Sequence, residues 1–270
     1  MFKYNEKAYA EHIIKNGFGT KHLNQELTIM AKYFRDNQVK DEDIKDTLYS
    51  FCEKNMKGGF NKVTYFKNIN AAVKKAVDNQ EPLIVIDEIP VTEQELAIIN
   101  GLNIDYEYKK ILFTMMVLEK LNKEYYHLKS GKGKNNEHFF GGTAKNYKEL
   151  VESSGISFSK RNKSKYIHEV IHKLNDLGLV EIKNKGSIKL NYLYDISVSQ
   201  TIINVRNFEK IGQYYAMLSS QEKVKSCANC NEPIIALNNK KRYCDTCAQE
   251  AKKEQTRELA KISMRKRRNP

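Results

Sequence analysis

The stretch NYKELVESSGISFSKRNKSKYIHEVIHKLNDLGLVEIKNKGSIKLNYLY, residues 146–194, contains the periodicities that decide the fold of this chain. It begins with a short helical pattern, which is followed by a turn and by a longer helical pattern ending at Gly178. The apolar residues of the longer helix fall within one arc of about 120° on a helical wheel. These residues are Ile167, Val170, Ile171, Leu174 and Leu177. We therefore predict that this side of the helix packs against a core.

After Gly178, which is a typical helix C-cap, the pattern changes to that of two strands. Residues 181–183 form the first strand, Asn184-Lys185-Gly186 the turn, and Ile188, Leu190 and Tyr192 alternate along the second. Helix, turn, helix and hairpin in this order resemble a winged helix-turn-helix, whose second helix enters the major groove of DNA. We predict such a domain at residues 104–198, with residues 106–126 as its supporting helix and Phe139-Phe140 as a short first strand.

The longer helix also contains the sequence H-E-x-x-H, which is the motif of a zinc protease. Its residues are His168, Glu169 and His172, and Glu209 in FEKIGQYYAML is a candidate third ligand. That segment resembles the helix that supplies the third ligand in mobile-element repressor proteases of this type. Those proteases have a small residue or glycine where this chain has Ile171. A zinc metallopeptidase therefore stays an alternative to DNA binding.

The wheel places both histidines opposite the apolar arc, on the side that would face DNA. Phosphate contacts position such a protein on the duplex, whereas polar side chains on the helix read the bases. Candidates for phosphate contacts at the helix start and in the hairpin are Lys160, Arg161, Lys163, Lys165, Lys183, Lys185 and Lys189. Candidates for base contacts are Asn162, Lys165, His168, Glu169 and His172.

Composition favours a polyanionic partner. The 270 residues carry a net charge of +13, with 29% charged and 40% hydrophobic residues. Cations that neutralise phosphates release counterions, which drives binding to nucleic acid. No apolar run approaches about 18 residues and no signal-peptide pattern is present, so we expect a soluble, cytoplasmic protein without a membrane partner.

The apolar spacing in residues 1–80 predicts a helical domain. Residues 81–103 are expected to form a connector. The helical pattern resembles the small helical module at the C-terminal end of some mobile-element primases, and it contains no visible catalytic group. We expect this domain to bind a replication or transcription protein. In the connector, Leu83–Ile86 fits a short strand, and Thr92 with Glu95 forms a capping box.

Four of the five cysteines form the pattern C-x2-C-x13-C-x2-C within residues 223–250. Two such pairs supply four thiolates for one structural Zn²⁺ and leave no open coordination position. The metal ligands are Cys227, Cys230, Cys244 and Cys247. A redox dithiol is the alternative, although neither pair lies in a βαβ context.

A linker helix is expected at residues 199–222 and a basic helical tail at residues 251–270. The cations of the tail expected to follow a nucleic-acid backbone are Arg257, Arg265, Arg267 and Arg268. A cysteine pair that leads into a basic helix resembles the C-terminal zinc ribbons of many small phage and integrative-element proteins. Because the tail suits DNA or RNA equally, RNA binding is a further alternative.

The sequence thus predicts a mainly α chain with a helical domain, a central winged helix-turn-helix (α+β) and a small zinc ribbon. It resembles a winged-helix DNA-binding protein of a phage or mobile element, similar to a replication initiator. The resemblance implies double-stranded DNA as partner, in replication initiation or in transcriptional regulation, without enzymatic activity. A palindromic site would require a homodimer.

Overall fold

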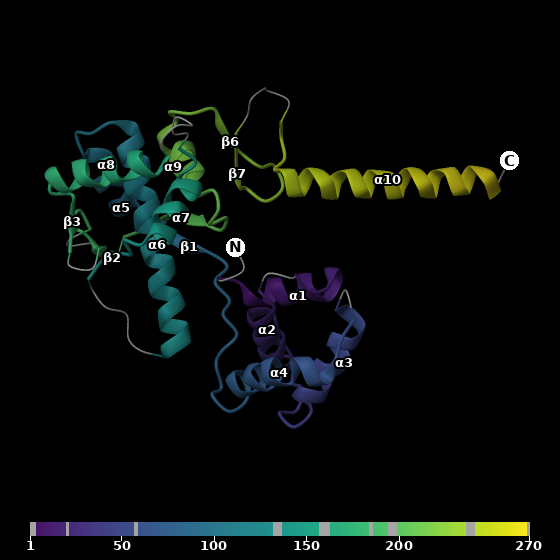
Figure 1. Ribbon diagram of the computed structural model, residues 1–270. Coiled ribbons are helices and arrows are strands. Elements are labelled where there is room, and N and C mark those ends of the chain that lie inside the picture. Colours follow the sequence, from purple (N-terminus) through teal and green to yellow (C-terminus); the bar gives the residue numbers. More distant parts are fainter. Residues whose placement is uncertain are drawn as a thin grey trace. The chain divides into compact units, whose positions relative to one another are not determined.

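The computed structural model describes residues 4–19, 22–56, 59–131, 137–156, 163–183, 186–193, 199–235 and 241–268 (Figure 1). The side chains of residues 163–165 and 258–268 lie outside this description. The described chain is mainly helical with small sheets, as expected for a mainly α protein. No described helix combines the length and the apolar character that a membrane span needs.

Two compact units divide the chain. The first contains the described residues up to Ile89, together with a later segment that starts at Lys120. The second contains Pro90–Glu119 and the chain from Glu137 onward.

The first unit is built on amphipathic helices that bury one side each. They are α1 (Glu6–Asn16), α2 (Leu23–Asp36), α3 (Ile44–Asn55) and α4 (Lys62–Ala76). Their core includes Ile13, Leu27, Leu48 and Cys52, all almost fully buried. The Asn61 side chain caps α4 by accepting hydrogen bonds from the backbone N–H groups of Val63 and Thr64, which fixes where this helix begins.

One expectation for the first unit is wrong, and one apolar residue of α4 lies outside the core. Phe66 does not lie on the inner side of α4, since half of its surface is exposed and the Lys45 amine lies 5.1 Å from its ring centroid. The small residues Ala72 and Ala76 are buried there instead, because α2 packs closely along α4. Leu83–Ile86 forms no strand; within it, Val85 makes a single bridge to Asn5.

The strand that follows lies a few residues later and pairs with a distant segment. β1 (Ile89–Thr92) is hydrogen-bonded to β5 (Thr201–Val205), and α5 (Glu93–Gly101) starts directly after β1. The expected capping box is present, since Thr92 and Glu95 exchange side-chain to backbone hydrogen bonds. Residues 199–222, expected as a linker helix, therefore contain β5 and the helix α9 (Ile211–Ser219).

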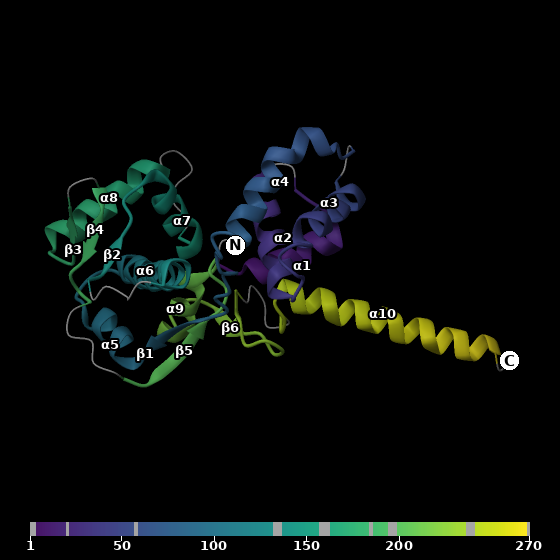
Figure 2. The ribbon, with the colours of Figure 1, turned by 90° about the horizontal axis from the view of Figure 1, so that it is seen from below.

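The long helix α6 (Tyr106–Ser130) supplies the core of the second unit with its residues up to Glu119. Leu112, Phe113 and Met116 are fully buried. The Phe113 ring lies 5.3 Å from the ring of Tyr215 in α9, centroid to centroid. Lys110, which is also buried, forms an ion pair of 2.5 Å with Glu222. Figure 2 shows α7, α8 and the neighbouring strands beside this part of α6.

Two helices and a three-stranded antiparallel sheet follow α6 in the second unit. The elements are β2 (Phe139–Phe140), α7 (Ala144–Ser154), α8 (Lys163–Asp176), β3 (Val180–Ile182) and β4 (Ile188–Leu190). The strand order is β2-β4-β3, so β4 lies between the other two. Phe140 pairs with Ile188, and Ile182 pairs with Ile188 from the other side.

Two glycines allow backbone segments of this unit to approach each other. A Cβ atom at Gly142 would overlap the backbone carbonyl of Gly186, just before β4. A Cβ atom at Gly212, in α9, would overlap the backbone carbonyl of Ser154 at the end of α7. Only glycine fits at both positions without a shift of the backbone.

The C-terminal part begins with a small antiparallel hairpin. Strands β6 (Val224–Ser226) and β7 (Pro233–Ile235) pair, and the helix α10 (Asp245–Arg268) follows. Ile234 is buried beside Cys227 and Cys247. These three residues form a core that is too small to stabilise this hairpin by hydrophobic burial alone.

Candidate nucleic-acid interface and metal centre

Helix α8 separates a buried apolar side from an exposed polar side. Ile167, Val170, Ile171 and Leu174 are at most 2% exposed, which confirms the predicted inner arc for these four positions. Leu177 departs from it with 50% exposure, because α8 ends at Asp176 and Gly178 turns the chain at φ 70°. Leu177 therefore lies in the turn after the helix and does not belong to its buried side.

The exposed side of α8 displays the three residues of the H-E-x-x-H sequence. His168, Glu169 and His172 are all solvent-exposed. The backbone of Lys163 and Lys165 belongs to the first turn of α8, whereas Lys160, Arg161 and Asn162 lie outside the described residues. The polar side thus offers two imidazoles and a carboxylate, groups able to donate hydrogen bonds to base edges or accept them from base edges.

The two histidines have different surroundings. The His168 ring packs edge-on against Tyr147 of α7 at 4.8 Å between centroids. Both rings line a cleft of about 280 Å³ between α7 and α8, with Val151 and Ile167. Burial raises the pKa of the Tyr147 hydroxyl, so this group stays a neutral hydrogen-bonding partner. No local sequence pattern singles out Tyr147, because its role depends on how α7 and α8 pack.

On the flank toward α6, two further contacts fix the orientation of α8. The Tyr166 hydroxyl donates a hydrogen bond of 3.1 Å to Glu107, and the Lys173 amine lies 4.7 Å from the ring centroid of Tyr108. This contact directs Lys173 toward α6. His168, Glu169 and His172 remain on the exposed side of α8.

The hairpin cations are partly neutralised. Lys183 forms an ion pair of 2.5 Å with Glu181, and Lys189 lies in the central strand opposite Glu181 and Phe139. Lys185 lies outside the described residues. Glu181 was not expected at this site, and it reduces the positive charge that the hairpin offers to a phosphate.

The predicted protease ligands do not come together with a third ligand in the described part of the chain. Glu209 is exposed in the turn before α9. Among the described His, Cys, Asp and Glu side chains, the four cysteines form the one group of three or more with metal-binding spacing.

These cysteines are the candidate metal centre. The ligand atoms of Cys227, Cys230, Cys244 and Cys247 all lie within 4.8 Å of one another. The Sγ atoms of Cys230 and Cys244 are 3.7 Å apart. Two sulfurs bound tetrahedrally at about 2.3 Å from one Zn²⁺ would be about 3.8 Å apart, so four thiolates at this spacing fit a tetrahedral ion.

Local backbone geometry places the four thiols and favours the thiolate form of Cys227. The first pair lies in the turn between β6 and β7, where Asn231 has a φ of 60°. In the second pair, Cys244 directly precedes α10 and Cys247 lies in its first turn. The backbone N–H of Cys244 donates to the Cys227 sulfur at 3.3 Å. Burial raises the pKa of the Cys227 thiol, but hydrogen bonds from the backbone at Cys230, Cys244 and Asn229 outweigh it and lower this pKa to about 6. Thiolate is the form that binds metal.

The helix α10 continues far beyond this centre. All described side chains from Ala248 to Arg257 are exposed, so this part of the helix buries nothing. Arg257 lies 3.7 Å from Glu254, an exposed pair. The backbone of Arg265, Arg267 and Arg268 is helical, which agrees with the expected helical tail.

Comparison with known proteins found no match among protein-family models, curated proteins or solved structures.

Proposed function

We propose that this chain is a sequence-specific DNA-binding protein in which residues 104–198 act as a winged helix-turn-helix. The observation that carries the proposal is the two-sided character of α8. Its apolar side is buried, and its exposed side displays His168, Glu169 and His172 together. A helix placed in the major groove needs this division between packing and reading.

The order of the neighbouring elements also supports the proposal. α6 precedes β2, α7 and α8, and the β3–β4 hairpin follows directly, with β4 between β2 and β3. The hairpin would be the wing. The net charge of +13 supports binding to a polyanion.

In the proposed mechanism, cations contact the DNA backbone and polar side chains contact the bases. The phosphate contacts, which would set the register on the duplex, would come from Lys160, Arg161, Lys163, Lys165, Lys183, Lys185 and Lys189. The contacts to base edges would come from Asn162, Lys165, His168, Glu169 and His172. Among these, the Glu169 carboxylate would accept a hydrogen bond from a cytosine amino group.

We further propose that the four cysteines bind one Zn²⁺ ion. The four-sulfur donor set and its spacing support this identity, since tetrahedral thiolate sites are typical of structural zinc. The ion would supply folding free energy to residues 223–250, which bury few apolar groups. The basic helix that follows would add non-specific contacts through Arg257, Arg265, Arg267 and Arg268.

The biological role that fits this chemistry is site recognition for a phage or mobile element, in replication initiation or in transcriptional regulation. Residues 1–80 would contact a replication or transcription protein. Mapping of bound DNA in cells separates the two roles. One peak at an origin supports initiation, and several peaks at promoters support regulation.

Selection from a random pool of DNA duplexes with the full-length protein tests the recognition step. We expect an enriched sequence whose affinity falls steeply with salt between roughly 50 and 200 mM. His172→Ala should reduce the preference for this sequence over a scrambled duplex by on the order of tenfold, the lower end for a direct base contact. His12→Ala, an exposed histidine of α1, is the matched control and should change nothing. If no sequence is enriched, or if single-stranded RNA of any sequence competes equally well, the proposal is wrong.

A further inference from the structure

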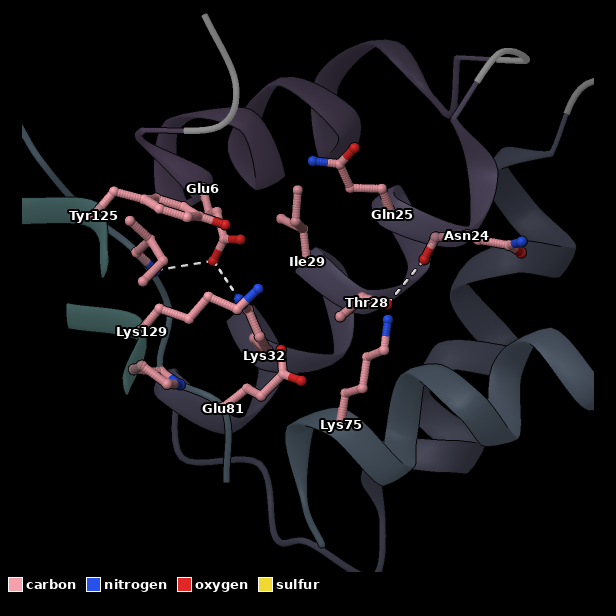
Figure 3. Close-up of a pocket in the computed structure, with 12 residues that line it drawn as sticks. Glu6, Asn24, Gln25, Thr28, Ile29, Lys32, Lys75, Glu81, Tyr125 and Lys129 are labelled. Atoms are coloured by element: carbon pink, nitrogen blue, oxygen red, sulfur yellow. Dashed lines mark hydrogen bonds and ion pairs between the residues drawn. The ribbon is translucent and has the colours of Figure 1, made fainter. Parts of the chain in front are cut away.

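The first unit contains a cavity of about 370 Å³, which no part of the proposed DNA-binding surface lines (Figure 3). Its walls come from α1, α2, α4, the segment 81–84 and the C-terminal end of α6. The volume falls in the range of pockets that hold small molecules. The chemistry of the walls indicates which kind of molecule fits.

A buried ion pair forms the floor. The Lys32 amine lies 2.5 Å from the Glu6 carboxylate, and the two side chains are 5% and 10% exposed. The same Glu6 oxygen accepts a hydrogen bond of 2.8 Å from the backbone N–H of Ile84. Because the charge of Glu6 is matched by Lys32, this carboxylate does not make the cavity a cation site.

Two further lysines enter from opposite walls. Lys75 comes from α4 and Lys129 from α6, and Figure 3 shows the first reaching toward Thr28 and the second toward Lys32. Among the described residues, neither lysine forms an ion pair. Glu81 is the other carboxylate in the lining. The lining therefore has three ammonium groups against two carboxylates, one of them already matched, and favours an anion.

The remaining walls suit a planar, hydrogen-bonding group. The Tyr125 ring lines the cavity, and the Lys129 amine lies 5.9 Å from its centroid. Gln25, from the first turn of α2, adds a side-chain amide to the lining, whereas the Asn24 side-chain oxygen accepts a hydrogen bond from Asn68. Aromatic rings stack on nucleobases, and amides pair with their edges.

We propose that this cavity binds a nucleotide, with its phosphate between Lys75 and Lys129 and its base against Tyr125. The nucleotide is either a free mononucleotide or the 5′-terminal nucleotide of a single strand, because both present the same phosphate and base. A divalent cation is disfavoured because Glu81 is the one carboxylate not matched within the cavity. An apolar ligand is disfavoured because few of the lining side chains are hydrocarbon.

Calorimetric titration of the full-length protein with dTMP, dAMP, thymidine and inorganic phosphate tests the site. We expect one nucleotide per chain, bound more tightly than thymidine or phosphate alone. Lys75→Gln and Lys129→Gln should each weaken mononucleotide binding by about tenfold, as expected for the loss of a charge-assisted hydrogen bond. Both lysines are exposed, so neither change should disturb folding. Lys74→Gln removes the same charge from the neighbouring exposed position of α4, which does not line the cavity, and should have no effect.

A short single strand with and without a 5′-phosphate distinguishes the two sources. Tighter binding of the phosphorylated strand than of the mononucleotide assigns the cavity to strand ends, and the reverse assigns it to free nucleotides. His172→Ala should leave mononucleotide binding unchanged, which separates this site from the proposed duplex contacts. The proposal is overturned if no mononucleotide binds saturably, or if Lys74→Gln weakens binding as much as Lys75→Gln does.

Discussion

The Tyr192 hydroxyl donates a hydrogen bond of 2.6 Å to the backbone carbonyl of Leu112, and both residues are buried. Leu112 lies in the second turn of α6, and Tyr192 follows the last strand of the three-stranded sheet. This bond attaches the end of the hairpin to the helix that supplies the core. The phenol group thus adds one side-chain hydrogen bond to the strand pairing and burial that position the hairpin.

Tyr192→Phe should lower the free energy of unfolding by about 1 kcal/mol, the usual contribution of one hydrogen bond. Urea unfolding of the full-length protein, followed by circular dichroism, measures this loss. Tyr126→Phe, at a tyrosine that is 62% exposed, is the control and should leave stability unchanged. Equal effects of both changes would contradict a special role for the bond to Leu112.

The same residue predicts a pH dependence. Burial raises the pKa of Tyr192 well above its usual value of about 10, so the folded protein keeps this phenol protonated where the unfolded chain releases its proton. The stability contributed by the neutral phenol is complete below pH about 10 and falls as the pH rises further. Tyr192→Phe should flatten the alkaline loss of stability. An unchanged alkaline profile would show that other groups cause it.

Gly212→Ala should destabilise the second unit by about 1–3 kcal/mol, because its Cβ atom would overlap the carbonyl of Ser154. Thermal unfolding measures the effect. Gly101→Ala is the matched control, since this glycine ends α5 and a Cβ atom there meets nothing within 4 Å. The control should be neutral or slightly stabilising, as alanine is the better helix former. A neutral Gly212→Ala would mean that α7 and α9 can separate at little cost.

Glu6→Gln should cost about 3–5 kcal/mol, because it leaves the buried ammonium of Lys32 without its charge partner. The control is Glu53→Gln, which breaks the exposed pair with Lys62 and should cost less than about 1 kcal/mol. Chemical unfolding of both variants beside the parent protein gives the comparison. Similar losses would argue that water reaches Lys32.

Cys244→Ser should abolish retention of the metal ion, since one of four ligands is lost. Elemental analysis of the purified protein should find one zinc per chain before the change and none after it. Cys52→Ala, in the core of the first unit, should keep the zinc, because Cys52 lies outside the cysteine cluster. Acidification should release the ion as the thiolates take up protons. A full complement of zinc in Cys244→Ser would contradict the assigned ligands.

The sequence was sufficient where a local rule acts alone. Thr92 marks the start of α5 through its capping box, and Gly178 marks the end of α8. The spacing of the four cysteines likewise identified a cluster that the fold brings together. Each of these signals is contained in a few consecutive residues or in a fixed chemical motif.

Features that depend on residues far apart in the chain could not be predicted from the sequence. Phe66 fits the helical spacing of apolar residues in α4, yet it is half exposed. Ala72 and Ala76 are buried there, because α2 packs closely on α4. The strand at residues 201–205 was hidden because its partner, β1, precedes it by more than a hundred positions. Lys75 and Lys129 belong to different helices, so no local pattern could reveal that they share a cavity.

The contact between Gly142 and Gly186 has a consequence for the evolution of this chain. Exposed lysines can drift to other polar residues with little loss, but any side chain at position 142 would push the segment before α7 away from the residues that enter β4. Steric exclusion alone would then conserve glycine at this position as strictly as metal binding conserves the cysteines. In a library of random variants, Gly142 should tolerate as few replacements as Cys244.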